Sequence, residues 1–148
     1  MNHLNLLLIL GLLSVGSHSA RADEPCQPEN NEIAYAKGIA TSLQKFVPKV
    51  TKTGDFVIKE EYSREGTQVI FISFVDSGVT LFTQTAKASI DHTATYIKAG
   101  KTKNGDPGFS VALGQGNTGE CRYNVLFRDS RFVVIDKGYK GYKPYPQR

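Results

Sequence analysis

The sequence from residue 55 onward alternates between apolar and polar side chains with a period of two, which is typical of β-strands that bury one face. Short turn sequences interrupt it, as in SREG at 63–66, DSG at 76–78 and RDS at 128–130, and favour antiparallel pairing of consecutive strands. The predicted strands are 55–62, 67–75, 79–86, 88–100, 108–113, 120–127 and 131–136, with a short helix as the alternative within 88–100. The run 67–75 is apolar on both faces, so we expect it to be the central strand of the first three.

A helical pattern precedes these strands. Apolar residues recur at the three- and four-residue spacing of one helix face, namely Ile33, Ala36, Ala40, Leu43 and Val47. Pro48 disfavours helical geometry in the residue before it, so we expect the helix to end there. One helix followed by many antiparallel strands predicts the α+β class, with an N-terminal amphipathic helix packed on one curved antiparallel sheet of about five to seven strands.

The first 22 residues have the organisation of a signal peptide. The apolar run 4–15 has the length of a signal-peptide core, and Ala20 and Ala22 form an A-x-A cleavage site. Polar residues from 17 onward stop the run well short of the roughly 20 residues that a membrane-spanning helix needs. We therefore expect cleavage near Ala22, a periplasmic or secreted protein without a stable membrane anchor, a single domain over 23–137 and an extended tail over 138–148.

Two cysteines, Cys26 and Cys121, fall in the part of the chain that follows the expected cleavage site. An even number of cysteines in an exported chain favours a disulfide. A metal site is the alternative, but the chain has neither C-x-x-C spacing nor histidines near these cysteines. The sequence therefore predicts one bridge between the two ends of the domain and no metal or cofactor.

The charge balance argues against a nucleic-acid partner. The chain has 18 Lys and Arg against 14 Asp and Glu, and Arg21 is the only charged residue of 1–22, so the expected mature chain carries +3. This excess is spread over many segments, whereas nucleic-acid binding usually shows as a concentrated basic face.

The stretch GQGNTG at 114–119 matches the G-x-G-x-x-G pattern of phosphate-binding loops. That chemistry requires the loop to lead from a strand into a helix N-terminus, where free N–H groups meet the phosphate. Here the residues that follow alternate like a strand. We therefore predict a turn between two strands.

His92 is the only histidine after residue 22, and it follows Asp91. It is the one weak candidate for a catalytic residue, because a histidine can act as a general base near neutral pH. A nucleophilic dyad would also need a serine or cysteine set against it, and the chain has no G-x-S-x-G stretch. An enzyme is therefore the less favoured interpretation.

Two segments are candidates for contact with a partner. A predicted basic loop contains Lys98, Lys101 and Lys103, and the tail contains Tyr139, Lys140, Tyr142, Lys143 and Tyr145. Tyrosine is enriched at protein interfaces, and cationic side chains add anion contacts. A solvated loop and an idle terminus are the alternatives for the two segments.

The predicted layout is similar to that of colicin M immunity proteins and small periplasmic lysozyme inhibitors, which are exported, small and built on an antiparallel sheet with cysteines joining distant parts. This similarity implies a binding module that acts by occupying a partner protein in the cell envelope or outside the cell. A mildly basic chain is a poor match for lysozyme, because lysozyme is itself strongly basic. The alternatives are a small-ligand carrier with an apolar pocket between helix and sheet, and a secreted hydrolase or nuclease toxin using His92.

Overall fold

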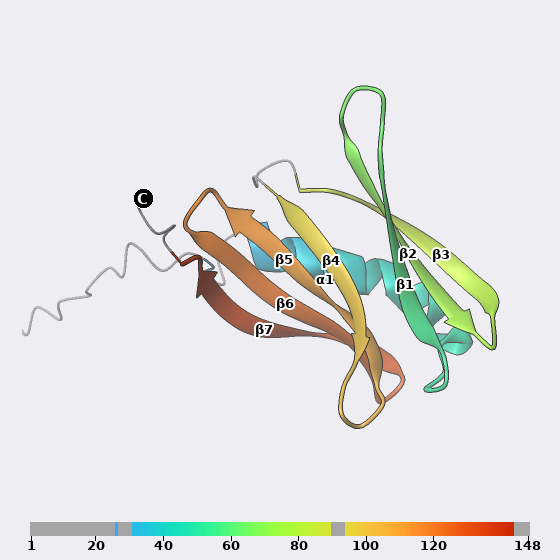
Figure 1. Ribbon diagram of the computed structural model, residues 1–148. Helices are drawn as coiled ribbons and strands as arrows, with labels where there is room; N and C mark the ends of the chain where they lie inside the picture. The colour runs from blue at the N-terminus through green and yellow to red at the C-terminus, as the bar shows by residue number, and fades with distance from the viewer. Residues whose placement is uncertain (1–25, 27–30, 90–93, 144–148) are drawn as a thin grey trace, which may run out of the picture.

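The computed structural model describes Cys26, residues 31–89 and residues 94–143, so the predicted signal peptide lies outside the described residues (Figure 1). Helix α1 (Asn31–Leu43) continues into the 3-10 helix η1 (Gln44–Lys49). The described strands are β1 (Asp55–Tyr62), β2 (Gln68–Asp76), β3 (Val79–Lys87), β4 (Thr95–Lys101), β5 (Pro107–Gln115), β6 (Gly119–Arg128) and β7 (Arg131–Gly141). The α+β class is confirmed, and β4 at 95–101 overlaps the strand predicted at 88–100.

The strands form two antiparallel sheets, so the prediction of a single curved sheet was wrong. One sheet has the order β1-β2-β3 and the other the order β4-β5-β6-β7. Strand β2 is central in its sheet, as its apolar run predicted. The end of β4 meets β1 through side chains, where Lys101 Nζ lies 2.8 Å from Asp55 Oδ1. Alternation specifies which face of a strand is buried and not which strand lies beside it, so the sequence could not divide the strands between two sheets.

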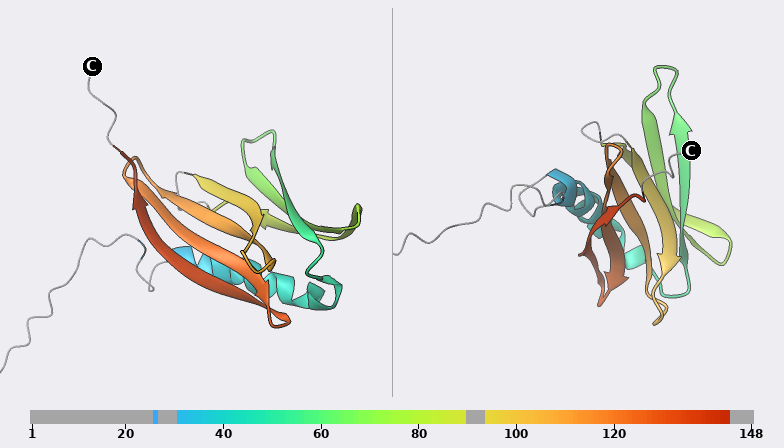
Figure 2. Two further views of the ribbon diagram at one scale, coloured as in Figure 1. Left: turned by 60° about the horizontal axis from the view of Figure 1, so that its bottom comes forward. Right: turned by 60° about the vertical axis from the view of Figure 1, so that its left-hand side comes forward.

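Helix α1 packs against the inner faces of both sheets, on the side where β3 and β7 are edge strands (Figure 2). The Tyr35 hydroxyl donates to Lys87 O of β3 at 2.7 Å, and Gln44 Nε2 donates to Phe132 O of β7 at 3.2 Å. Tyr35 of α1 and Gln44 of η1 therefore each bond the edge of a sheet, that of β3 and that of β7. The predicted end of the helix at Pro48 was wrong. Helix α1 ends at Leu43, and Pro48 lies inside the 3-10 helix η1, a structure that is common at helix C-termini.

Aromatic rings join the two sheets in one core. The ring of Phe56 on β1 makes edge contacts with Phe74 of β2, with Phe109 of β5 and with Phe132 of β7, at centroid distances of 5.1, 5.3 and 6.0 Å. All four side chains are buried. The two sheets and the helix therefore share one hydrophobic core.

The predicted disulfide between Cys26 and Cys121 is present, with Cα atoms 5.6 Å apart. Cys121 lies on the buried face of β6, and Cys26 comes shortly before α1 in the chain. The bridge therefore attaches the segment ahead of the helix to the four-stranded sheet.

The turn at 114–119 connects β5 directly to β6, as predicted, with Thr118 N donating to Gln115 O at 3.2 Å. The predicted turn at 128–130 is also present. Asp129 and Ser130 both have positive φ, 50° and 57°, as a two-residue type I′ hairpin requires. Both segments are therefore connections between consecutive antiparallel strands.

Strand β7 continues beyond the predicted strand end at residue 136. Residues 138–141 belong to it, so the predicted boundary of the tail at 138 was wrong. The register explains the error: Arg122 faces Gly138 and Tyr123 faces Asp136, which leaves Lys137 as an extra residue in a β-bulge. The bulge interrupts the two-residue alternation from which the strand was predicted.

Candidate functional site

The outer face of the four-stranded sheet, opposite α1, carries a hollow of about 700 Å³. In Figure 1 the helix lies behind this sheet, so the outer face points toward the viewer. The hollow is lined by Tyr96 and Lys98 of β4, Ser110 and Ala112 of β5, Glu120, Arg122 and Asn124 of β6, and Lys137 and Lys140 of β7. We call this surface the trough.

The floor of the trough exists because β5 carries small residues on one face and large ones on the other. Its buried face contains Phe109, Val111 and Leu113. Its outer face presents Ser110 and Ala112 to the trough. Successive side chains of a strand point to opposite faces, so the same strand supplies both the core and the open floor.

Strand β6 supplies an ion pair at one end of the trough. Arg122 Nε donates to Glu120 Oε1, and the Tyr142 hydroxyl donates to Glu120 Oε2 at 3.3 Å. Glu120 is buried although it lies on the outer face. Burial and the neighbouring Glu120 carboxylate raise the pKa of the Tyr142 hydroxyl, which therefore stays a hydrogen-bond donor at neutral pH.

The remaining cations of the trough come from its two sides. Lys98 projects from β4, while Lys137 and Lys140 project from β7. Within the described residues, none of these three lysines forms an ion pair with a carboxylate, whereas Arg122 is paired with Glu120. The trough therefore offers positive charge that the described part of the chain leaves unneutralised.

The structure brings together three of the residues predicted from sequence. Lys98 and Lys140 line the trough, and Tyr142 bonds to Glu120 at its end. The predicted basic loop was wrong in part: Lys98 and Lys101 lie on β4, because the strand extends to residue 101, and only Lys103 lies in the turn that follows.

The other candidates lie elsewhere. Lys101 is paired with Asp55, and Lys143 is exposed just beyond β7. Tyr139 faces Cys121 across the ladder, which places it on the sheet face opposite Lys140. Two further candidates, His92 and Tyr145, lie outside the described residues.

Sequence reasoning missed Tyr96, Glu120, Arg122 and Lys137. The first three follow from alternation, because Tyr96 and Lys98, and likewise Glu120 and Arg122, are two residues apart and share a face. No comparable signal identified Lys137, since its direction depends on the bulge.

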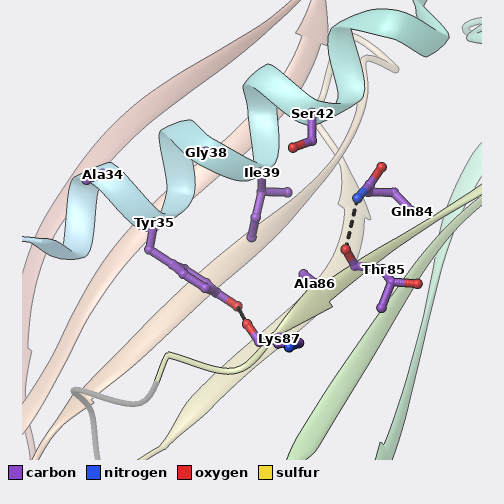
Figure 3. A pocket seen from close by; sticks show the side chains of 9 residues that line it. All are labelled: Ala34, Tyr35, Gly38, Ile39, Ser42, Gln84, Thr85, Ala86 and Lys87. Atoms are coloured by element: carbon purple, nitrogen blue, oxygen red, sulfur yellow. Dashed lines mark hydrogen bonds between the residues drawn. The ribbon is translucent and has the colours of Figure 1, made fainter.

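A second hollow, of about 310 Å³, lies between α1 and β3 (Figure 3). The helix contributes the small residues Ala34, Gly38 and Ser42, and the opposite wall is the edge of β3 at 84–87. Tyr35 bridges the two walls through its bond to Lys87 O. Burial raises the pKa of Tyr35 to about 12, so its hydroxyl remains a donor across the physiological range.

Stacked aromatic rings also pack between the helical segment and the sheets. Phe46 of η1 stacks on Phe82 of β3 with ring centroids 4.2 Å apart, and Phe82 stacks in turn on Phe74 at 5.7 Å.

Among the described residues no group of three or more His, Cys, Asp or Glu is placed to hold a metal ion. The helices of the described segments are too short and too polar to cross a membrane.

Of the two hollows, the trough is the larger and the only one of the pair that combines several unpaired cations with a tyrosine more than half exposed, Tyr96 at 56%. Its chemistry fits binding of an anionic surface. Comparison of the chain with protein-family models, with curated proteins and with solved structures gave no match.

Proposed function

We propose that this chain is an exported binding module that acts by occupying a partner protein, in the manner of a periplasmic immunity protein or enzyme inhibitor. The trough is its contact surface in this proposal. Export rests on the signal-peptide pattern of 1–22, and the disulfide Cys26–Cys121 is compatible with an oxidising compartment.

The observation that carries the proposal is the composition of the trough. Exposed tyrosine and arginine side chains are enriched where proteins bind one another. Here Tyr96, Tyr142 and Arg122 border a concave surface that the fold does not need for its own core. A rigid sheet also holds these side chains in fixed positions, which lowers the entropic cost of binding.

Capture from the cell envelope tests this function. The full chain with a C-terminal tag is expressed in its own host, so that 1–22 can direct export, and the stoichiometric partner is identified after purification. The variant Ala112→Trp fills the floor of the trough without changing its charge, and Val57→Trp places the same side chain on the outer face of the other sheet as a control. We expect Ala112→Trp to reduce recovery of the partner by about tenfold, the effect of about 1.4 kcal/mol.

Equal recovery with both tryptophan variants would refute the trough as the contact surface. Recovery of a small molecule without a protein would favour the alternative function, a small-ligand carrier. The observation in favour of that alternative is the hollow between α1 and β3, although core side chains such as Leu43, Phe46 and Phe82 also pack between the helical segment and the sheets.

A further inference from the structure

We infer that the trough recognises an acidic, extended segment of its partner protein, and that the bulge in β7 is the element that assembles its cationic side. This inference rests on the proposed function, since it specifies what enters the same surface. It follows from the positions of Lys98, Lys137 and Lys140 and from the register of β7 against β6.

The bulge changes which face each residue of β7 occupies. Before it, Phe132 and Val134 face the core; after it, Tyr139 faces buried Cys121 and Lys140 pairs with Glu120 on the trough side. In an uninterrupted strand, residues 137 and 140 are an odd number of positions apart and lie on opposite faces. Only the extra residue allows Lys137 and Lys140 to line the same trough.

The geometry of the bulge is specified locally. Gly138 has a φ of 73°, which residues other than glycine rarely adopt, and its N–H donates a hydrogen bond to Asp136 Oδ1 at 2.7 Å. An added Cβ at Gly138 would meet no atom within 4 Å, so the glycine is required by its backbone conformation and not by crowding. Bulges of this kind often re-aim side chains beside functional sites.

The distribution of charge indicates an extended ligand. Strands β4 and β7 are three ladder steps apart, or about 14 Å at the usual spacing of paired strands. A single carboxylate or phosphate reaches both walls only if the lysine side chains fold inward over the floor, because their donors are the terminal ammonium groups. A chain that carries several carboxylates can lie across the small floor of Ser110 and Ala112 and reach Lys98 on one side and Lys137 with Lys140 on the other.

The neutral groups of the trough favour a peptide over other polyanions. The amide of Asn124 can both donate to and accept from a peptide backbone. Lys98, Lys137 and Lys140 are few for a nucleic acid, whose affinity rises with the number of phosphates neutralised. Glu120 also adds a negative charge inside the same surface, although Arg122 compensates it.

A synthetic acetylated octaglutamate peptide is the probe, with an octaserine peptide as its neutral counterpart. Binding to the mature, disulfide-bonded protein is measured by calorimetry, together with binding to a single-stranded DNA oligonucleotide and to heparin. We expect octaglutamate to bind, octaserine not to bind, and affinity to fall as salt rises from about 0.05 M to about 0.5 M, because salt screens exposed charges.

Three variants locate the interaction. Lys137→Ala with Lys140→Ala removes the cations of β7, and Lys59→Ala with Lys87→Ala removes the same charge from the other sheet. The exchange Tyr139→Lys with Lys140→Tyr keeps composition and net charge but moves one cation to the opposite face. We expect the first variant to weaken octaglutamate binding by about tenfold, the exchange by a few fold, and the control by less than about twofold.

Equal losses in the trough variant and the control would show that only net charge matters and would overturn the inference. Preference for heparin or DNA over octaglutamate would overturn it in favour of another class of polyanion. Partner capture that is lost in Ala112→Trp but unchanged in Lys137→Ala with Lys140→Ala would refute the acidic segment and leave the proposed function standing. Thermal unfolding of each variant identifies any loss caused by misfolding.

Discussion

The two sheets of this protein are alike on their inner faces and differ on their outer faces. Both contribute large apolar side chains to the same core, where Phe56 of β1 contacts Phe109 of β5. The outer face of β1-β2-β3 pairs its own polar groups, as in the Lys59–Glu61 ion pair and the Ser73–Thr83 hydrogen bond. The outer face of β4-β5-β6-β7 instead carries a trough with three lysines that have no ion pair in the described structure.

This difference separates the requirements of folding from those of binding. Inner residues are fixed by close packing, so they leave little freedom for function. Outer residues of a strand are free to vary, and only one of the two sheets uses that freedom for a charged concave surface. Perturbing each sheet in turn should therefore affect stability and binding to different degrees.

The largest expected effect on stability comes from the disulfide, which attaches the segment before α1 to the four-stranded sheet and does not involve the three-stranded one. The bridge joins residues 95 positions apart, and opening a loop of that length is expected to cost about 4 to 5 kcal/mol in unfolding free energy. We expect Cys26→Ser with Cys121→Ser to show this loss in urea unfolding. A loss below about 1 kcal/mol would mean that the segment before α1 adds little to the sheet.

Phe56→Ala tests whether the inner faces really form one core. It removes a ring that contacts four phenylalanines from both sheets, so we expect a loss of about 3 to 5 kcal/mol. The neighbouring Val57 points to the outer face and is 49% exposed, so Val57→Ala should change stability by less than about 0.5 kcal/mol. Two separate unfolding transitions in Phe56→Ala would indicate that the sheets unfold independently.

The half-buried Tyr35 of α1 and the buried Tyr123 of β6 provide a smaller contrast. Tyr35 donates to Lys87 O of β3, so Tyr35→Phe should cost about 1 kcal/mol. The hydroxyl of Tyr123 on β6 is buried without a hydrogen-bond partner in the described structure, so removing it by Tyr123→Phe should be neutral or stabilising. Equal destabilisation by both substitutions, measured by urea unfolding, would contradict the assignment of these contacts.

The same tyrosines predict a loss of stability at alkaline pH. Burial raises the pKa of both hydroxyls from 10.0 to about 12, and Asp136 and Glu32 add to the effect on Tyr123. The folded state thus holds these protons more tightly, so the stabilisation is complete below pH 10 and is lost as pH rises toward 12. Ultraviolet absorbance should detect one late-ionising tyrosine fewer in each phenylalanine variant than in the wild type.

The sequence predicted the parts of the fold that depend on local patterns. Strand β1 matches its predicted range of 55–62, and the turns at 63–66, 76–78 and 128–130 lie where glycine, aspartate and serine indicated them. The division into two sheets was not predictable, because it depends on side-chain contacts between β1 and β4 such as Lys101 with Asp55.

The candidate site was only partly predictable for the same physical reason. Lys98 and Lys140 were identified by composition, yet their common surface depends on pairing between strands distant in the sequence. The bulge at Lys137 hid the end of β7, because it shifts the alternation by one residue between Phe132 and Tyr139. A pattern of period two cannot distinguish such a shift from the end of a strand.

The smallest expected effect concerns the three-stranded sheet at acidic pH. Hydrogen bonds from Thr51 first, and then from Ser77 and Thr53, hold the pKa of Asp76 below its ordinary value of 3.8. The folded state therefore favours the ionised carboxylate, so the stabilisation is present above pH 3.8 and is lost as pH falls through the lowered pKa. Asp76→Asn should flatten this acidic part of the stability curve.

Thr51→Val removes the donor at 2.9 Å from the Asp76 carboxylate and should weaken the same pH dependence. The double variant should lose no more unfolding free energy than Asp76→Asn alone, because both substitutions break the same hydrogen bond. Additive losses in urea unfolding at pH values above 3.8, where the carboxylate is ionised, would show that Thr51 and Asp76 act independently.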